Sequence, residues 1–176
     1  MHANTWKRVS RKLSTYLLRL NGVALALSFA GCASGTRSNA DVHSILHLIT
    51  TYALSIDRAD TALADQIWSN APEVSFIHPR GEEHGRTQIE TDVYRDLMGA
   101  TFSERKLTPK DISVYVYGEA AWSQFNWDFV AKFKANGAPI HTQGRETQIY
   151  HRENGRWGIV HVHYSGAPVT GNLKGF

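Results

Sequence analysis

The stretch from Arg145 to Pro168, RETQIYHRENGRWGIVHVHYSGAP, is the most informative part of the sequence for the fold class. Apolar and polar residues alternate on both sides of Asn154-Gly155, which is typical of strands. Asn and Gly both tolerate a positive φ, so this dipeptide favours a two-residue hairpin turn. The stretch therefore predicts two long antiparallel strands joined at residues 154–155.

Upstream of this hairpin, the periodicity predicts helices first and strands afterwards. The expected helices cover residues 41–57, 60–68 and 87–102. The expected strands cover residues 74–78, 111–117, 120–134, 142–152 and 157–165. A loop with Pro79, Gly81 and Gly85 is expected after the first strand. This order predicts an α+β domain in which a curved antiparallel sheet packs on three helices.

The first 31 residues have the layout of a secretory signal peptide. Cations lie in a region without acidic residues, and a short apolar run from Leu20 to Ala30 follows. This run is too short to span a bilayer as a mature helix. We therefore expect a signal peptide over 1–31, a tether over 32–40, the domain over 41–168 and a C-terminal tail over 169–176.

Cys32 is the only cysteine and follows the apolar run directly, in Phe29-Ala30-Gly31-Cys32. This arrangement resembles a bacterial lipobox, in which the thiol is lipidated, although phenylalanine replaces the usual leucine. The alternative is ordinary signal-peptidase cleavage near Ala30, with Cys32 incidental. A lone cysteine excludes an internal disulfide, and a free thiol is unusual in an exported chain. We therefore favour lipidation of Cys32 and a lipid-anchored protein in the bacterial periplasm.

The basic residues near the N-terminus mask a mildly acidic domain. The chain has 19 Lys and Arg and 16 Asp and Glu residues, and the cations at positions 7, 8, 11, 12 and 19 precede Cys32. The remainder therefore lacks the electrostatic footprint of a nucleic-acid-binding protein, and we expect no nucleic-acid partner. Membrane association is expected to come from the lipid.

Alternation along residues 120–134 gives one strand two different faces. The even positions carry Gln124, Asn126 and Asp128 in the middle of the strand. A sheet buried on both sides would not place three polar groups there for packing alone. This face is therefore either solvated or lines a polar cavity.

The opposite face of the same strand is an aromatic stripe of Phe125, Trp127, Phe129 and Phe133. It is either a sheet-to-sheet dimer interface or ordinary core. If the helices cover the polar, pocket-bearing face, the stripe needs another cover, because so large a patch is unusual on a free monomer. We therefore favour a homodimer or higher oligomer.

Several short motifs carry a resemblance to a known family. They are Asn136-Gly137-Ala138-Pro139, Glu146-Thr147, His151-Arg152, Gly155-Arg156-Trp157, Ile159-Val160-His161, His163, Ser165-Gly166-Ala167-Pro168 and, upstream, Phe76-Ile77-His78-Pro79 with His84-Gly85. They resemble the association (hub) domain of calcium/calmodulin-dependent protein kinase II, in the nuclear transport factor two-like superfamily with SnoaL-like cyclases and ketosteroid isomerases. The resemblance implies a cone-shaped, cystatin-like α+β fold with a pocket between sheet and helices, and a tendency to oligomerise.

The chain also departs from the hub pattern. Hub pockets present arginines on the inward faces of their last strands, and the aligned positions here hold Asp128, Gln148 and Tyr164. A pocket suited to carboxylates thereby becomes neutral to acidic. Aspartate and tyrosine in such a pocket resemble the acid–base groups of the ketosteroid isomerase branch.

In the register that this alignment implies, one hollow collects the candidate site residues. They are Asp128, Tyr164 and Glu146 as catalytic candidates, and Asn126, Gln148, Tyr150 and His78 as ligand-binding candidates. Two carboxylates in a partly dry cavity repel, so one takes a raised pKa and can abstract a proton next to a carbonyl. Tyr164 can then donate a hydrogen bond to the oxyanion, with Glu146 or His78 as auxiliary acid.

His161 and His163 share one strand face, where His151 of the facing strand can join them. His-x-His on a strand can bind zinc, but no further ligand clusters with it. We interpret the histidines as packing or hydrogen-bonding residues at a subunit interface and expect no metal. Phosphate-loop, nucleophile-elbow, dinucleotide and zinc-protease motifs are absent from the sequence, so we expect no cofactor.

Two classes of function stay open. The first is an exported, non-catalytic module that binds a small molecule or mediates assembly. The alternative is an isomerase, cyclase or dehydratase that transfers a proton next to a carbonyl, with Asp128 as base and Tyr164 as oxyanion donor. We favour the first class, because the same polar groups can simply hydrogen-bond one another inside a polar cleft.

Overall fold

The computed structural model describes residues 30–167, with side chains from residue 38 onward. The chain divides into two units after Arg37, and the sheet belongs to the unit that begins at Ser38. Most of the expected signal peptide, the side chain of Cys32 and the expected tail lie outside the described part. Within that part, no helix combines the length and apolar character needed to cross a membrane.

The helices follow the predicted periodicity. They are α1 (Ala30–Arg58), α2 (Thr61–Ile67), α3 (Gly85–Gln88) and the π-helix η1 (Ile89–Ala100), which continues α3. Asp60 caps α2, because its carboxylate accepts hydrogen bonds from the backbone N–H groups of Ala62 at 2.9 Å and Leu63 at 3.1 Å. Helix α1 already begins at Ala30, so residues 32–40 are helical where we expected a tether.

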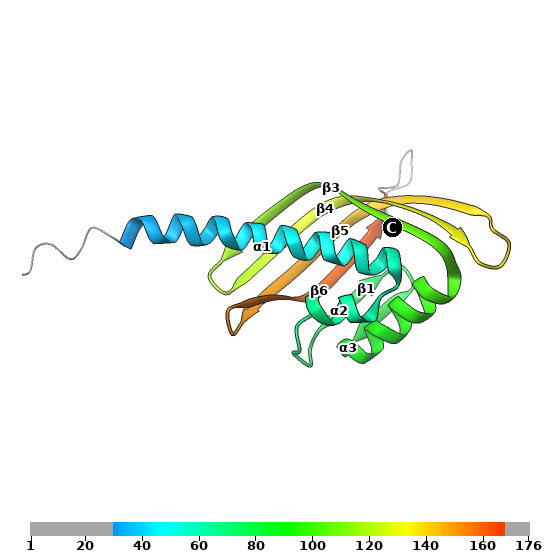
Figure 1. Ribbon diagram of the computed structural model, residues 1–176, viewed down its shortest axis with the longest axis horizontal. Helices are drawn as coiled ribbons and strands as arrows, with labels where there is room; N and C mark the ends of the chain where they lie inside the picture. The colour runs from blue at the N-terminus through cyan, green and yellow to red at the C-terminus, as the bar shows by residue number, and fades with distance from the viewer. Residues whose placement is uncertain (1–29, 168–176) are drawn as a thin grey trace, which may run out of the picture. The chain divides into compact units, whose positions relative to one another are not determined.

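The strands form one curved, open sheet (Figure 1). They are β1 (Ser75–His78), β2 (Gly81–His84), β3 (Phe102–Tyr117), β4 (Ala120–Phe133), β5 (Pro139–Glu153) and β6 (Arg156–Gly166), in the order β2-β1-β6-β5-β4-β3. Neighbouring strands are antiparallel except β1 and β6, which are parallel. The predicted α+β class is confirmed. The expected antiparallel sheet is wrong at the β1–β6 pairing, which is parallel and is not joined by a hairpin.

The predicted hairpin at Asn154-Gly155 is confirmed. Asn154 has a φ of 52° and Gly155 a φ of 80°, the two positive values that a type I′ turn requires. From this turn, β5 and β6 pair from Glu153 and Arg156 to Gly144 and Gly166.

Two strands exceed the sequence prediction. Strand β2 occupies part of the expected loop and pairs with β1 as a short hairpin. Strand β3 begins at Phe102, well before residue 111, and lies at the sheet edge, where it pairs only with β4. Residues 103–106, near the start of β3, are Ser-Glu-Arg-Lys and mostly exposed. Because they are polar, the sequence pattern did not predict a strand there.

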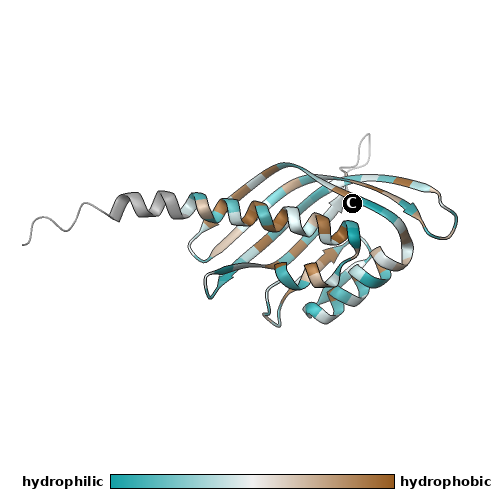
Figure 2. Ribbon diagram, in the orientation of Figure 1, coloured by the Kyte–Doolittle hydropathy of each residue, from teal (hydrophilic) through white to brown (hydrophobic). Residues whose placement is uncertain are grey.

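The hydrophobic core lies between the helices and one side of the sheet. Its largest fully buried side chains include Trp68, Tyr52, Tyr94, Tyr150, Phe76 and Phe125. Hydrophobic and hydrophilic residues alternate along the strands (Figure 2), as expected for strands with two different faces. We call the side that carries Phe125 the inner face of the sheet and the opposite side the outer face.

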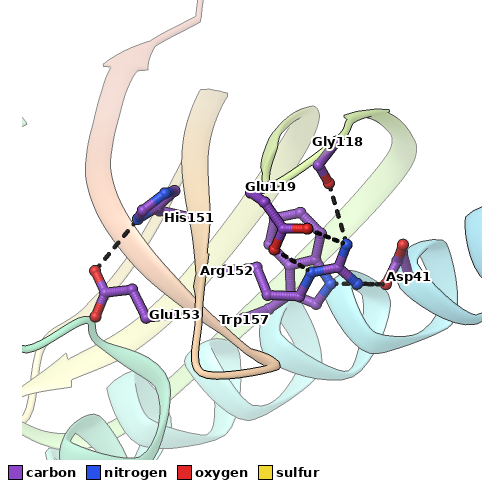
Figure 3. Close-up of polar contacts among 7 residues, drawn as sticks. All are labelled: Asp41, Gly118, Glu119, His151, Arg152, Glu153 and Trp157. Atoms are coloured by element: carbon purple, nitrogen blue, oxygen red, sulfur yellow. Dashed lines mark hydrogen bonds and ion pairs between the residues drawn. The ribbon is translucent and has the colours of Figure 1, made fainter.

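A charged cluster fastens α1 to two turns of the sheet (Figure 3). Arg152 Nη1 donates to Asp41 Oδ1 at 2.6 Å, while Nε and Nη2 donate to the two carboxylate oxygens of Glu119 at 2.8 and 3.0 Å. Its guanidinium lies 4.9 Å from the ring centre of Trp157, whose Nε1 also donates to Asp41 at 3.1 Å. These contacts hold the helix, the β3–β4 turn and the β5–β6 hairpin together.

Candidate functional site

A cavity of about 170 Å³ lies between the helices and the inner face of the sheet. Most of its wall is apolar: Ile56, Phe76, Leu97, Met98, Phe102, Leu107, Phe129 and Ile140. The remaining lining residues are Tyr52, Trp127, Thr142, Glu146 and Tyr164. The cavity therefore combines hydrophobic walls with a few polar groups, which is the usual composition of a small-molecule site.

Glu146 supplies the one carboxyl group among the lining residues. On β5 it lies opposite Phe125 of β4 and Tyr164 of β6, so strand alternation directs its side chain to the inner face. It is only 3% exposed. The lining residues include no lysine, arginine or histidine, so the carboxyl group has no cationic partner in the cavity wall.

Burial raises the pKa of Glu146 from 4.5 to about 8, because an ionised carboxylate loses its hydration in an apolar cavity. Hydrogen bonds from Gln148 and Tyr52 act in the opposite direction and limit this rise of the pKa, since they favour the charged form. Glu146 is therefore mostly protonated at pH 7 and exchanges its proton close to neutral pH.

Behind Glu146 lies a row of buried polar side chains. Gln148 Nε2 donates to Glu146 Oε1 at 2.6 Å, and the Tyr150 hydroxyl donates to Gln148 Oε1 at 2.6 Å. Ser123 Oγ lies 2.7 Å from the Tyr150 hydroxyl. Gln148 and Tyr150 therefore face inward, as predicted, but they contact Glu146 and each other and do not line the cavity.

Tyr164 forms the β6 side of the cavity and is held by aromatic neighbours. Its ring stacks on His78 at 6.0 Å between ring centres and meets Phe76 and Trp127 edge-on at 5.9 and 5.6 Å. Burial raises the pKa of its hydroxyl to about 12, so the group stays protonated and able to donate a hydrogen bond.

His78 lies behind Tyr164 and does not line the cavity. Its Nδ1 accepts a hydrogen bond from the backbone N–H of Arg80 at 3.3 Å, and its Nε2 lies 2.8 Å from Glu83 Oε1. Nδ1 is then unprotonated and Nε2 carries the proton. Because both ring nitrogens are engaged, His78 supports Tyr164 by its ring face.

The structure corrects the predicted positions of Asp128 and Asn126. Both point to the outer face, away from Glu146, because Asp128 pairs with Gln143 and Asn126 with Arg145 across β4 and β5. Asp128 contacts Lys110 and Gln143, and its Oδ1 lies 3.3 Å from His141 Nε2. The expected pair of neighbouring carboxylates, Asp128 and Glu146, therefore does not form.

The aromatic stripe faces inward. Phe125, Trp127 and Phe129 are all buried in the core, and two of them line the cavity. The proposal that this stripe is a dimer interface is wrong, because the helices cover it and leave the polar positions of β4 outside. The stripe thus supplies no argument about oligomeric state.

Sequence reasoning missed Tyr52 and Trp127 as cavity residues. Trp127 packs closely against Gly144 of β5, where a Cβ atom would approach its Cζ2 to 2.4 Å. The indole Nε1 of Trp127 is buried and has no hydrogen-bond partner. The sequence signal for this contact was Gly144 itself, since glycine inside a strand often marks close approach of another group.

The histidines on β5 and β6 make local contacts. His161 Nδ1 lies 2.8 Å from Ser75 Oγ, and His151 Nδ1 lies 3.3 Å from Glu153 Oε1. Burial and the neighbouring His163 lower the pKa of His161. Among the residues with described side chains, no group of three or more His, Cys, Asp or Glu is arranged to hold a metal ion.

Both the sequence and the fold of this chain are similar to those of known proteins. The sequence profile of the SnoaL-like domain matches residues 45–170. A nuclear transport factor 2 (NTF2-like) superfamily protein from Salmonella enterica shares 45% sequence identity at a TM-score of 0.74, and the match covers 76% of this chain and 96% of that chain.

More distant structures share the fold alone. Hexachlorocyclohexane dehydrochlorinase from Novosphingobium barchaimii is 13% identical at a TM-score of 0.66, covering 79% of this chain and 94% of that chain. A protein designated a calcium/calmodulin dependent protein kinase II association domain, from Xanthomonas campestris, is 21% identical at a TM-score of 0.60, covering 72% and 87%.

Proposed function

Because the chain belongs to the SnoaL-like domain family of the nuclear transport factor 2-like superfamily, we propose that its cavity binds a small, mostly apolar molecule that carries one oxygen function. The observation that carries this proposal is an apolar cavity with one protonatable carboxyl group, Glu146, in its wall. An engineered cavity of about 150 Å³ binds benzene, so a cavity of about 170 Å³ suits a ligand with one ring.

The wall chemistry supports a neutral ligand. A carboxylate or phosphate ligand needs a cationic partner when it is taken out of water, and the lining residues supply none. A ketone or alcohol oxygen needs only hydrogen bonds. Protonated Glu146 and the Tyr164 hydroxyl can both donate one, and Thr142 offers a third hydroxyl.

A thermal-shift and calorimetry panel of one-ring ketones and alcohols tests the binding proposal. We expect at least one compound to raise the melting temperature of the wild-type protein. Leu97→Phe, which fills the cavity, should abolish this stabilisation. Asp128→Asn is the matched control on the outer face and should bind like the wild type. Equal binding by wild type and Leu97→Phe, or stabilisation by no compound, contradicts the proposal.

The raised pKa of Glu146 favours a second candidate function, proton transfer next to a carbonyl. Ionised Glu146 would take a proton from the carbon next to the carbonyl. The C–H electron pair would become the C=C bond of an enolate, whose oxygen would accept a hydrogen bond from Tyr164. The fold neighbour designated a dehydrochlorinase makes elimination a further reaction class to test.

Glu146→Gln separates the two functions. A binding module keeps its affinity within a few-fold, because an amide can replace a protonated carboxyl as hydrogen-bond donor. An enzyme loses turnover by about 10²-fold or more, since the amide cannot accept the proton. Turnover that survives Glu146→Gln contradicts the catalytic candidate and leaves the binding proposal intact.

We also propose that the protein is exported, lipidated at Cys32 and self-associating. The N-terminal sequence pattern supports the first two parts, and the likeness to hub domains supports the third. Intact mass spectrometry of the protein from the envelope fraction should find a shortened, lipidated chain, and Cys32→Ser should prevent this processing.

Sedimentation at micromolar concentration tests self-association. It should show at least a dimer, and a clean monomer contradicts self-association.

A further inference from the structure

Three buried polar residues behind Glu146 have no contact with the cavity. Ser123 and Gln148 are both 0% exposed, as is Tyr150, and none of them lines the cavity wall. Buried polar side chains cost stability unless they are hydrogen-bonded, and a purely structural row could be replaced by apolar residues. The row ends on Glu146, which suggests that it serves this carboxyl group.

We propose that Ser123, Tyr150 and Gln148 form a hydrogen-bond chain that positions the Glu146 carboxyl group and controls its affinity for a proton. The three are positioning residues, since they act through Glu146. The inference deepens the proposed function, on which it rests, by assigning control of the same carboxyl group to residues that a ligand does not touch.

Strand geometry brings the chain together. Glu146, Gln148 and Tyr150 occupy every second position of β5, so they share the inner face. Ser123 of β4 lies directly opposite Gln148. Along the row from Glu146 to Ser123, the three successive hydrogen bonds measure 2.6, 2.6 and 2.7 Å. The row is therefore continuous.

The chain has a defined direction. The Tyr150 hydroxyl has a single proton and donates it to Gln148 Oε1, so Ser123 Oγ is the donor to Tyr150. Because Gln148 Oε1 is occupied as an acceptor, the amide presents Nε2 to Glu146. An amide N–H can only donate, so it favours the ionised carboxylate, and in the acid form the proton lies on Oε2.

Burial and hydrogen bonds set the pKa of Glu146, and no charged group among the described side chains contributes to its shift. Glu146 contributes to the raised pKa of four tyrosines, which are Tyr52 from α1, Tyr94 from η1, Tyr164 from β6 and Tyr150 on β5. Burial raises the pKa of all four hydroxyls, so they stay neutral while Glu146 titrates. Loss of a hydroxyl therefore changes hydrogen bonding to Glu146 and leaves its charged surroundings unchanged.

The test is a pH titration of Glu146 in the ligand-free full-length protein, followed by the carbon-13 shift of its side-chain carboxyl. Glu146→Gln removes this resonance and so assigns it. The variants are Gln148→Leu, Tyr150→Phe and Ser123→Ala. Tyr94→Phe is the matched control, because it removes an equally buried hydroxyl that bonds Ser55 and Trp68 instead of Gln148.

We expect Gln148→Leu and Tyr150→Phe to raise the pKa of Glu146 by about one pH unit or more, the size of one hydrogen bond to a charged group. In Tyr150→Phe the amide of Gln148 is free to rotate and present its oxygen, which favours the protonated acid. Ser123→Ala should raise the pKa less, because Tyr150 still donates to Gln148.

A pKa in Tyr150→Phe that matches the Tyr94→Phe value within about 0.3 pH units overturns the proposal. This outcome stays available if Gln148→Leu fails to fold. Because no ligand is present in the titration, failure of the cavity to bind any compound leaves the result unaffected. The two proposals can therefore fail separately.

Discussion

Strands β4 and β5 are neighbours in one sheet, yet they bury different kinds of side chain. On β4 the aromatic Phe125 is buried and the polar Asn126 is exposed. On β5 Glu146 and Gln148 are buried, while Ile149 between Gln148 and Tyr150 is 41% exposed. The inner face is therefore apolar from Phe125 to Phe129 on β4 and partly polar on β5.

Hydropathy therefore identifies the face of a strand only where that face is ordinary core. Strand β4 packs apolar side chains against the helices, and alternation assigns its faces correctly once the aromatic residues are taken as buried. Strand β5 carries the carboxyl group of the cavity and its hydrogen-bond partners, so polar side chains enter the interior. Deviations of this kind are expected at functional sites.

Phe125→Ala should have the largest effect, because it removes a buried aromatic ring from the inner face of β4. We expect the free energy of unfolding to fall by about 3–5 kcal/mol, the usual result of deleting a buried aromatic ring. Chemical denaturation measures this loss. A loss below about 1 kcal/mol would mean that the inner face of β4 is not core.

Gly144→Ala tests the contact between the two strands and should come next. The new Cβ would lie 1.9 Å from the backbone oxygen of Ser165 and 2.4 Å from Trp127 Cζ2. We expect a loss of roughly 3 kcal/mol, since the backbone oxygen cannot move aside easily. Gly166→Ala is the matched control, because its Cβ meets nothing within 4 Å. Equal stability of the two variants contradicts the close contact.

The polar side of the comparison predicts a pH dependence of stability. The unfolded chain ionises Glu146 above pH 4.5, whereas the native protein keeps the proton up to about pH 8. The unfolded state therefore binds fewer protons in this window, and the free energy of unfolding should fall by about 1.4 kcal/mol per pH unit from Glu146.

Denaturation at several pH values measures this slope. Glu146→Gln should lose it, while Glu104→Gln, which changes an exposed glutamate paired with Lys132, should keep it. A slope that survives Glu146→Gln means that another group is responsible.

Ile149→Thr should have the smallest effect, because this isoleucine lies on the outer face. We expect a change within about 0.5 kcal/mol in dilute protein. Ile159→Thr, at a fully buried position of β6, should cost several times more. A large loss from Ile149→Thr would show that the outer face is covered, and its dependence on protein concentration would identify a second copy as the cover.

The local rules predicted most of the fold. Asn154-Gly155 identified the closing hairpin, and the helical periodicity identified the helices. The missed parts, β2 and the first half of β3, lie at the two edges of the sheet. Edge strands carry many polar residues, so they lack the hydrophobic signal of central strands.

The candidate site was predicted in part, because the faces of β4 were assigned the wrong way round. The roles of Glu146, Gln148, Tyr150 and Tyr164 stay predictions, but their shared inner face is correct. The predicted register placed Asp128 on the same face as these residues. In the structure Ser123, and not Gln124, lies opposite Gln148, so the odd positions of β4 share a face with Gln148, and Asp128 does not. A shift of one residue reverses every side chain of a strand, so one register error moved Asp128 and Asn126 across the sheet.

The wall of the cavity draws on several separate parts of the chain, and the separation of two of them bears on how the protein can evolve. Leu97, Met98, Phe102 and Leu107 come from η1 and β3. Glu146 and the row of Gln148, Tyr150 and Ser123 come from β4 and β5. Mutations in the first segment can reshape the space for a ligand while the proton-carrying group keeps its surroundings. Paralogues and laboratory libraries can therefore diversify what enters the cavity by varying residues 97–107, with residues 123–150 held constant.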